Sequence, residues 1–342
     1  MLSSLVAAAV LVLARPPVGP PCVAGMDPGA RSLPVDYMDG RYFVRWSLKG
    51  GDTLRMYLDT GGPRDHLTAG AVQRLGLIRE VKQLGPDSVS WVRLPAAIAT
   101  QLVPSLRSNN YLEDSTRTWP PESARLMAYF PKEDGFGSER DRVDGILGPD
   151  WFGGRVWTLD YAGRKLWYHE NGATTSVPAA CWVPLGFQLD SAGRRSSNFP
   201  RITAVVDGDS VDFLLDTGAM TVLSDAARRA TNQPTGKIVA ASFIIHSRFE
   251  RWRAGHPDWL VVENADIRYH NRMIRVPSIE VGGQRQGPVW FSERPDAAFH
   301  NFMSQWMDRQ IDGALGGSAW RDVVVVLDYP GARAAILTAP AR

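Results

Sequence analysis

The sequence has 342 residues, a formal net charge of +2 at pH 7, and hydrophobic residues at 44% of its positions. This length allows two lobes with cores of their own, and the near-neutral charge argues against a protein that binds nucleic acid or an anionic membrane. The 32 Gly and 24 Pro indicate a chain with many turns.

The N-terminal stretch 1–13 is apolar and uncharged, and Arg15-Pro16-Pro17 ends it. It is too short to span a membrane and is typical of the apolar region of a signal peptide, although no Lys or Arg precedes it. We therefore predict a signal peptide over residues 1–25, an exported (periplasmic or extracellular) protein, and no membrane span in the mature chain. Removal of the leader would take Cys22 and leave Cys181 as the single cysteine, so no intramolecular disulfide is expected.

The first half of the chain is predicted to be mostly β. After a Pro-, Gly- and Asp-containing linker over 26–40, alternating residues predict strands over 42–48 and Thr53–Leu58, joined by a turn. A short helix is expected over 69–77, with Thr68 as its N-cap. Proline-broken strands follow between 81 and 132, and a further pair is predicted over 156–161 and 165–168.

The second half repeats this order. Strands are predicted over 202–206 and 211–215, and a short helix over 221–230 with Ser224 as a possible N-cap. A broken β region over 238–290, a helix over 299–307 and a strand over 323–329 complete it. We expect an N-terminal lobe over 41–180 and a C-terminal lobe over 181–342.

One tripeptide occurs in both halves, as Asp59-Thr60-Gly61 and Asp216-Thr217-Gly218. Each copy follows an apolar run, so a strand that ends in a tight turn would carry the Asp to the rim of a buried sheet. The copies are 157 positions apart. This spacing suggests two halves that each contribute one carboxylate to a shared site.

Two further landmarks recur in register. Asp144 and Asp312 each begin an Asp-Gly-X-Leu-Gly sequence and are 168 positions apart, as are Asp160 and Asp328 of the two Leu-Asp-Tyr sequences. The second half therefore carries 11 more residues between its tripeptide and its Asp-Gly-X-Leu-Gly sequence. Three matching landmarks in the same order predict an internal duplication.

The tripeptides and the later sequences Ile146-Leu147-Gly148 and Ala314-Leu315-Gly316 resemble the active-site and psi-loop motifs of the aspartic peptidases. The resemblance extends over residues 41 to 338. It implies an all-β-dominated, bilobal aspartic-peptidase (acid protease) β-barrel fold with a few short helices and two duplicated lobes. Gly62 and Ala219, which follow the tripeptides, look more like retropepsin-like members than like pepsins. Those single-lobe members must dimerise, whereas this chain holds both lobes and is expected to be a monomer.

The resemblance also implies an endopeptidase mechanism. Asp59 and Asp216 would share one proton, because two close carboxylates cannot both ionise easily. The ionised carboxylate would activate a water that attacks the peptide carbonyl, and the protonated one would donate to the carbonyl oxygen. No cofactor and no metal would be needed. Thr60 and Thr217 would lock the pair across the lobes, and Gly61 and Gly218 would let backbone N–H groups approach the carboxylates.

Two expectations follow from departures from the pepsin pattern. Gly62 and Ala219 stand where pepsin-like members often have a hydroxyl that donates to a catalytic carboxylate, so the pKa of the ionised Asp should be less depressed. We therefore expect a mildly acidic to neutral pH optimum. The flap that closes over substrate has no recognisable motif, and Trp91 and Tyr111 are the candidates for its aromatic residue.

Other functions have weaker support. The six His form no zinc motif, and the chain has no Gly-X-Ser-X-Gly elbow and no phosphate-binding loop. The basic and aromatic stretch 248–253 is interpreted as an exposed strand face rather than a nucleic-acid surface. The partner is thus expected to be a peptide or protein substrate. The alternative left open is a non-catalytic aspartic-peptidase-like protein that acts as a peptide-binding or inhibitor module.

Overall fold

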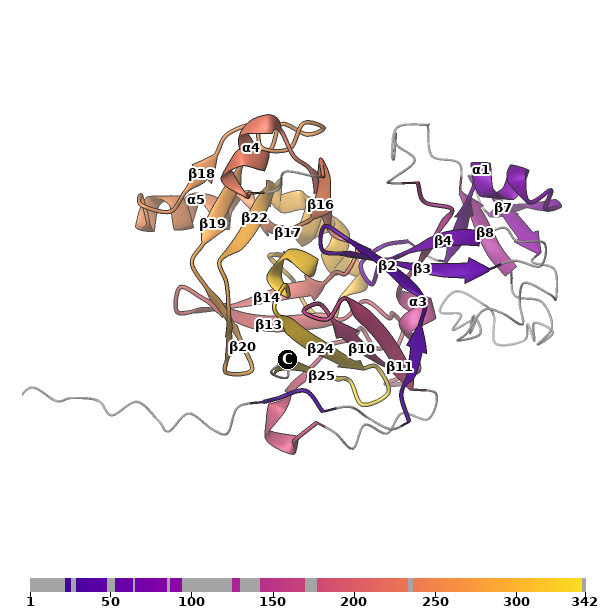
Figure 1. The fold of residues 1–342 in the computed structure, drawn as a ribbon, viewed down its shortest axis with the longest axis horizontal. Coiled ribbons are helices and arrows are strands. Elements are labelled where there is room, and N and C mark those ends of the chain that lie inside the picture. The colour runs from indigo at the N-terminus through magenta and orange to yellow at the C-terminus, as the bar shows by residue number, and fades with distance from the viewer. Residues whose placement is uncertain are drawn as a thin grey trace, which may run out of the picture.

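The computed structural model describes residues 22–25, 29–47, 53–63, 65–84, 87–93, 125–129, 142–169, 177–232 and 236–339. Two lobes lie to the left and right in Figure 1, and a sheet to which both contribute strands lies below them at the centre. The architecture is dominated by β-strands with a few short helices, as predicted. Within the described residues, no helix has the length and apolar character needed to cross a membrane.

The first lobe is built on an eight-stranded sheet of order β2-β3-β4-β9-β5-β8-β7-β6. The predicted hairpin before the first tripeptide is present as β3 and β4. Thr68 caps α1 by accepting a hydrogen bond from the N–H of Ala71. The elements are β2 Val35–Met38, β3 Arg41–Ser47, β4 Thr53–Leu58, β5 His66–Thr68, α1 Ala69–Arg74, β6 Arg79–Leu84, β7 Asp87–Arg93, β8 Arg125–Tyr129, β9 Gly145–Leu147 and α3 Pro149–Phe152.

The second lobe is built on a nine-stranded sheet of order β18-β19-β22-β17-β23-β14-β13-β20-β21, beside a two-stranded sheet of β15 and β16. Its strands are β13 Arg201–Val206, β14 Asp209–Leu215, β15 Met220–Val222, β16 Ile238–Ala240, β17 Ser242–Ile245, β18 Val261–Val262, β19 Met273–Val276, β20 Ile279–Val281, β21 Gln284–Gln286, β22 Val289–Arg294 and β23 Gly313–Leu315. Its helices are α4 Asp225–Ala230 and α5 His246–Gly255, with short helical turns η3 Ala298–Phe302, η4 Met303–Trp306 and η5 Gly317–Ala319.

The two lobes share a six-stranded sheet of order β1-β11-β10-β24-β25-β12. Strands β10 and β24, which carry the two Leu-Asp-Tyr sequences, pair antiparallel, with Leu159 opposite Val325. The buried rings of Trp157 and Tyr329 belong to the core that continues from this sheet into both lobes. The elements here are β1 Arg31–Leu33, β10 Val156–Asp160, β11 Lys165–His169, η2 Ala179–Cys181, β12 Trp182–Pro184, β24 Val323–Asp328 and β25 Arg333–Thr338.

Each lobe contains the same arrangement of three strands, in which the middle strand pairs parallel with one neighbour and antiparallel with the other. In the first, β9 pairs parallel with β4 and antiparallel with β5. In the second, β23 pairs parallel with β14 and antiparallel with β17. Strands β5 and β17 also each pair parallel with a later strand, β8 or β22. This arrangement places the end of β4 and the end of β14, and therefore the two tripeptides, next to the psi-loop strands.

The helix of the second lobe that corresponds to α1 is α5, not the predicted helix over 221–230. The N–H of Thr68, just before α1, donates to the carbonyl of Asp144, and the N–H of Ile245, just before α5, donates to the carbonyl of Asp312. The predicted helix does form, as α4 with its cap Ser224. It lies in an excursion over 220–240, which contains β15, α4 and β16 and is closed by a hydrogen bond from Ala241 N–H to Ala219 O (2.8 Å).

Two sequence-based assignments are wrong. The linker predicted over 26–40 is contradicted over its described residues 29–40, because β1 pairs with β11 and β2 pairs with β3. The stretch 248–253 is not a strand but belongs to α5. Phe249 and Trp252 are both buried, and a spacing of three residues puts them on one face of a helix, whereas in a strand they would point to opposite faces.

The structure also contains a disulfide that the sequence analysis did not expect, between Cys22 and Cys181. The N-terminal segment that carries Cys22 is held further by hydrogen bonds from Thr338 N–H to Cys22 O (2.7 Å) and from Ala24 N–H to Thr338 O (3.0 Å). Cleavage after residue 25 would remove these contacts. Residues 22–25 therefore belong to the folded body in this structure rather than to a separate leader.

Candidate active site

The two tripeptides are locked together across the lobes by their threonines. Thr60 Oγ1 donates to the carbonyl of Leu215 (2.6 Å) and accepts from the N–H of Thr217 (2.9 Å). In the opposite direction, Thr217 Oγ1 donates to the carbonyl of Leu58 (3.1 Å) and accepts from the N–H of Thr60 (3.1 Å). Both threonines are buried. Four reciprocal hydrogen bonds therefore fix the position of each tripeptide relative to the other.

This lock brings the carboxyl groups of Asp59 and Asp216 close together, so that each one shifts the pKa of the other. The N–H of Gly61 donates to Asp59 Oδ1 (3.1 Å), and the N–H of Gly218 donates to Asp216 Oδ1 (2.9 Å). A Cβ atom at Gly61 would lie 2.4 Å from the carboxyl carbon of Asp216, and one at Gly218 would lie 2.1 Å from that of Asp59. Only glycine leaves room for the carboxyl group of the opposite lobe at these positions.

The psi-loop strands support the backbone of each Asp. The N–H of Asp59 donates to the carbonyl of Leu147 (3.0 Å), and the N–H of Asp216 donates to the carbonyl of Leu315 (2.9 Å). Ile146 and Ala314 lie within the same two strands, β9 and β23, which pair in register with β4 and β14. The backbone positions of both Asp residues are thus set by a neighbouring strand.

The two glycines that end the psi-loop motifs are held by side chains of their own lobes. The N–H of Gly148 donates to Asp65 Oδ1 (2.7 Å), and the N–H of Gly316 donates to Ser242 Oγ (3.2 Å). A Cβ at Gly316 would lie 2.0 Å from the carbonyl oxygen of Ala241. The close packing here leaves no space for a side chain.

The electrostatic environment differs between the two carboxyls. Burial, the charge of Asp216 and the hydrogen bond to Asp216 raise the pKa of Asp59 well above its usual value. Burial also raises the pKa of Asp216, but the hydrogen bond from Asp59 and the N–H groups of Gly218 and Ala219 oppose that increase. Burial raises the pKa of both carboxyls, and two carboxyls this close favour a state in which they hold one proton between them.

The residues after the two tripeptides have no hydroxyl, but their backbones approach the carboxyls. The N–H of Gly62 lowers the pKa of Asp59, as that of Ala219 does for Asp216, against the larger effect of burial. A Cβ at Gly62 would lie 2.2 Å from Asp59 Oδ2. The sequence analysis noted Gly62 only for a missing donor, whereas the structure shows that a side chain there would meet the carboxyl.

Tyr57 is a site residue that sequence reasoning missed. Its hydroxyl, on β4 in the first lobe, donates to the carbonyl of Gly218 in the second (2.9 Å), and its side chain is buried. The corresponding position before the second tripeptide is Leu214, which is apolar. The hydroxyl of Tyr57, within the otherwise apolar run that leads to Asp59, was the feature of the sequence that could have indicated this role.

A pocket of about 570 Å³ opens beside Asp216 in the second lobe. Met220 and Val222 of the 220–240 excursion contribute to its wall, together with Phe243 of β17. Its remaining lining includes Tyr269 and Arg294. The excursion that distinguishes the second lobe from the first therefore forms part of the space next to the carboxyl pair.

The flap candidates remain predictions. Trp91 lies on β7, where it pairs with Glu80 of β6 and Met127 of β8. Tyr111 lies outside the described residues. Neither position is therefore tested as the residue that would close over a substrate.

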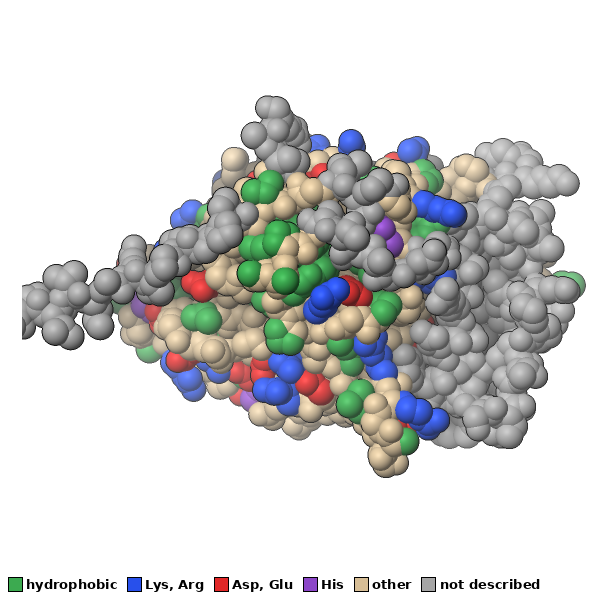
Figure 2. Space-filling model, turned by 90° about the horizontal axis from the view of Figure 1, so that it is seen from below, with side chains coloured by type: hydrophobic (Ala, Val, Ile, Leu, Met, Phe, Trp, Pro, Cys, Tyr) green, Lys and Arg blue, Asp and Glu red, His purple; other side chains and the backbone are tan. Residues whose placement is uncertain are grey.

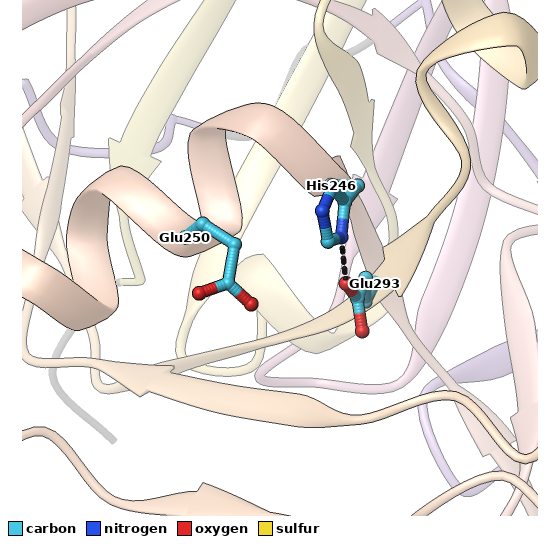
Figure 3. A group of neighbouring side chains, drawn as sticks. All are labelled: His246, Glu250 and Glu293. Atoms are coloured by element: carbon cyan, nitrogen blue, oxygen red, sulfur yellow. Dashed lines mark hydrogen bonds and ion pairs between the residues drawn. The ribbon is translucent and has the colours of Figure 1, made fainter.

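One cluster outside this site has metal-ligand chemistry: His246, Glu250 and Glu293, whose ligand atoms lie within 4.8 Å of one another (Figure 3). Arg272 already supplies a cation there. Its Nη2 donates to Glu250 Oε1 and Glu293 Oε1 (2.6 Å each), and its Nε donates to Glu293 Oε2 (2.7 Å). The cluster is an ion-pair network that joins α5 to β22.

On the face drawn in Figure 2, the described side chains show no dominance of either positive or negative charge. Figure 2 shows acidic and basic side chains interspersed over the described part of one face, with apolar side chains between them. This distribution matches the net charge of +2. It offers no strongly positive patch on that face of the kind that contacts phosphate backbones.

No family model and no curated protein matches the chain. Among solved structures, the aspartic proteinase from Irpex lacteus is similar over 90% of this chain and 97% of its own, with 11% sequence identity and a TM-score of 0.44. At that identity, the comparison concerns the course of the chain and not its activity.

Proposed function

We propose that this protein is an aspartic endopeptidase that hydrolyses the peptide bonds of a substrate at a site between its two lobes. The observation that carries the proposal is that the threonine lock places the carboxyl groups of Asp59 and Asp216 beside each other between the lobes. A proton-sharing carboxyl pair provides an acid and a base side by side, which peptide hydrolysis by an activated water requires.

In the proposed mechanism, the ionised carboxyl of the Asp59–Asp216 pair removes a proton from a water bound between the carboxyls, and that water attacks the substrate carbonyl. The protonated carboxyl donates a hydrogen bond to the carbonyl oxygen as negative charge develops on it. Burial raises the pKa of both groups, which supports a shared proton. No covalent enzyme intermediate forms.

We further propose that the protein is a duplicated, retropepsin-like member of the family and acts as a monomer. The shared strand crossings of the two lobes support duplication. The absence of a hydroxyl after both tripeptides, at Gly62 and Ala219, supports the retropepsin-like assignment. Because one chain supplies both Asp59 and Asp216, a second copy is not needed to complete the pair.

We propose export to an oxidising compartment, with the leader cleaved before Cys22. A disulfide such as Cys22–Cys181 persists in the periplasm or outside the cell and is rare in the cytosol. Cleavage before Cys22 would keep this bond in the mature protein. The N-terminal sequence of the secreted protein, read by mass spectrometry, tests this placement.

The peptidase proposal is tested by turnover of an unfolded protein substrate. The wild type should cleave it, a statine-type inhibitor should block cleavage, and Asp59→Asn and Asp216→Asn should each lose nearly all activity. Asp258→Asn, at an exposed position of the second lobe, is the matched control and should retain activity. Equal activity of the wild type and both dyad variants would refute the proposal. Peptide binding without turnover would instead favour the non-catalytic peptide-binding or inhibitor module.

A further inference from the structure

The pocket beside Asp216 combines apolar walls with basic side chains. Met220, Val222 and Phe243 supply apolar surface. The charged side chains that line it are Arg268, Arg294, Asp216 and Asp266. A pocket next to the carboxyl pair is where a substrate side chain close to the cleaved bond would lie. Its chemistry therefore bears on which peptides the site accepts.

Arg294 is the basic residue that the fold holds in place. It ends β22, and its guanidinium stacks on the ring of Phe243, with Cζ 3.9 Å from the ring centroid. Nη1 donates to Ser292 Oγ (2.8 Å) and to the carbonyl of Glu293 (2.8 Å). These contacts leave Nη2 and Nε without a hydrogen-bond partner among the described residues, although burial lowers the pKa of the guanidinium.

The nearby acid Asp266 does not neutralise Arg294 by direct contact. Asp266 Oδ2 accepts from Thr221 Oγ1 (2.5 Å), and Oδ1 accepts from the N–H groups of Arg268 (2.8 Å) and Tyr269 (3.1 Å). Its carboxylate thus braces the loop at the pocket rim against the 220–240 excursion. Among the described residues, no carboxylate oxygen lies within 4.0 Å of a guanidinium nitrogen of Arg294, so Arg294 makes no direct ion pair there.

A partly buried guanidinium that makes no direct ion pair favours an incoming anion, even with the charge of Asp266 nearby. Arginine presents parallel N–H groups that match the two oxygens of a carboxylate, and such charge-assisted pairs are stronger than neutral hydrogen bonds. The apolar walls would pack the aliphatic stem that carries such a carboxylate. The shape and charge of the pocket therefore match one kind of substrate group.

We propose that this pocket binds a carboxylate of the substrate, with Arg294 as the residue that selects it. The carboxylate can come from a Glu or Asp side chain close to the cleaved bond or from the free C-terminus of a short peptide. This inference rests on the proposed peptidase function, and it names the substrate class that the site prefers.

The test begins with the cleavage sites of the wild-type protein in a denatured protein, mapped by mass spectrometry. One cleaved peptide is then made in four forms: with Glu or with Gln at the acidic position, and with a free or an amidated C-terminus. We expect kcat/KM to fall about 10- to 100-fold when the recognised carboxylate is replaced, because a hydrogen-bonded charge is lost. A loss with Gln identifies the side chain, and a loss with the amide identifies the C-terminus.

Variants then assign the preference to Arg294. Arg294→Gln should lower kcat/KM for the acidic peptide to the level of its neutral analogue and leave the neutral analogue unchanged. Arg294→Lys should restore part of the preference. Arg275→Gln removes an exposed arginine of the same sheet that does not line the pocket and should leave the preference intact. Equal hydrolysis of all four peptides, or an unchanged preference in Arg294→Gln, would overturn the inference.

A binding measurement separates this inference from the proposed function. The four peptides are titrated into the Asp59→Asn variant by calorimetry, so that the result does not depend on turnover and the pocket lining is unchanged. Tighter binding of the acidic form, lost on combination with Arg294→Gln, supports the pocket assignment even if the wild type cleaves nothing. Equal binding of all four forms overturns it, even if the wild type is an active peptidase.

Discussion

The hydroxyl of Tyr57 in the first lobe donates a hydrogen bond to the carbonyl of Gly218 in the second (2.9 Å). Gly218 also donates its N–H to Asp216. Tyr57 therefore positions the peptide segment that carries one of the two carboxyls, although it touches neither. This contact crosses the same boundary as the threonine lock and makes the site dependent on both lobes at once.

Tyr57→Phe should weaken the site through this contact. The carbonyl of Gly218 would lose a buried donor, at a cost of about 1–3 kcal/mol in the free energy of unfolding, and kcat should fall because Asp216 is held less firmly. Tyr42→Phe is the matched control. The Tyr42 hydroxyl is buried and has no hydrogen-bond partner within the described residues, so its removal should be neutral or slightly stabilising. Urea unfolding and kcat of both variants check this; equal effects would contradict it.

Gly62→Ala should lower activity more than stability. The added Cβ would lie 2.2 Å from Asp59 Oδ2, so the carboxyl must turn away from Asp216. We expect kcat to fall at least about tenfold, which corresponds to about 1.4 kcal/mol in the activation barrier. Gly70→Ala, in α1, adds a Cβ into open space and should stabilise the helix by about 0.5–1 kcal/mol. Full activity of Gly62→Ala would show that the glycine is not required.

The pH–rate profile should be bell-shaped and displaced upward from that of isolated carboxyls. Activity needs one ionised carboxyl, and burial raises the pKa of both Asp59 and Asp216, so the acidic limb should lie above 3.8. It also needs one protonated carboxyl, and a close pair releases its second proton at a higher pH, so the alkaline limb should lie higher still. Measurement of kcat/KM across the pH range tests both limbs. An optimum near that of a gastric enzyme would contradict the assignment.

The same pKa shifts predict how stability depends on pH. A carboxyl whose pKa is raised by folding binds its proton more tightly in the folded state. Its stabilising contribution is therefore fully present below the unfolded pKa and is lost as the pH rises through the folded pKa. Because the pKa of Asp59 is raised most, Asp59→Asn should make the melting temperature less sensitive to rising pH in that range. If the melting temperatures of the wild type and of Asp59→Asn fall equally as the pH rises, the result would argue against a buried shared proton.

The disulfide should stabilise the shared sheet without taking part in catalysis. It joins Cys22 to Cys181, which are 159 positions apart in the sequence. Replacing both by Ser should lower the free energy of unfolding by about 2–5 kcal/mol and leave kcat near that of the wild type at low temperature. Reducing agent should lower the melting temperature of the wild type but not of the double variant. A wild type that is insensitive to reduction would contradict the bond.

Local patterns predicted the strands and caps that lead into the site. The alternation in β3 and β4, the N-caps Thr68 and Ser224, and the repeat of Leu-Asp-Tyr in β10 and β24 all depend on neighbouring residues, and the structure contains each of them. The prediction that two carboxyls meet came from the repeated tripeptide alone.

Contacts between distant segments were not predictable in the same way. The pairing of Cys22 with Cys181 depends on where the N-terminal segment docks, and the linker assignment failed because β1 and β2 are short strands that form only against β11 and β3. Helix α5 was missed because its burial depends on the sheet beneath it. The pocket around Arg294 likewise arises from folding and has no local sequence signature. The hydroxyl of Tyr57 was visible in the sequence, but its partner, the carbonyl of Gly218, was not.

The central claim is that Asp59 and Asp216 act as one hydrolytic pair. A crystal structure of the protein with a statine-type peptide inhibitor tests it most directly, through the distances from the inhibitor's hydroxyl to the two carboxyl groups. The account predicts that this hydroxyl lies within hydrogen-bonding distance of both Asp59 and Asp216. A hydroxyl bound elsewhere, or carboxyl groups too far apart to share it, would contradict the account.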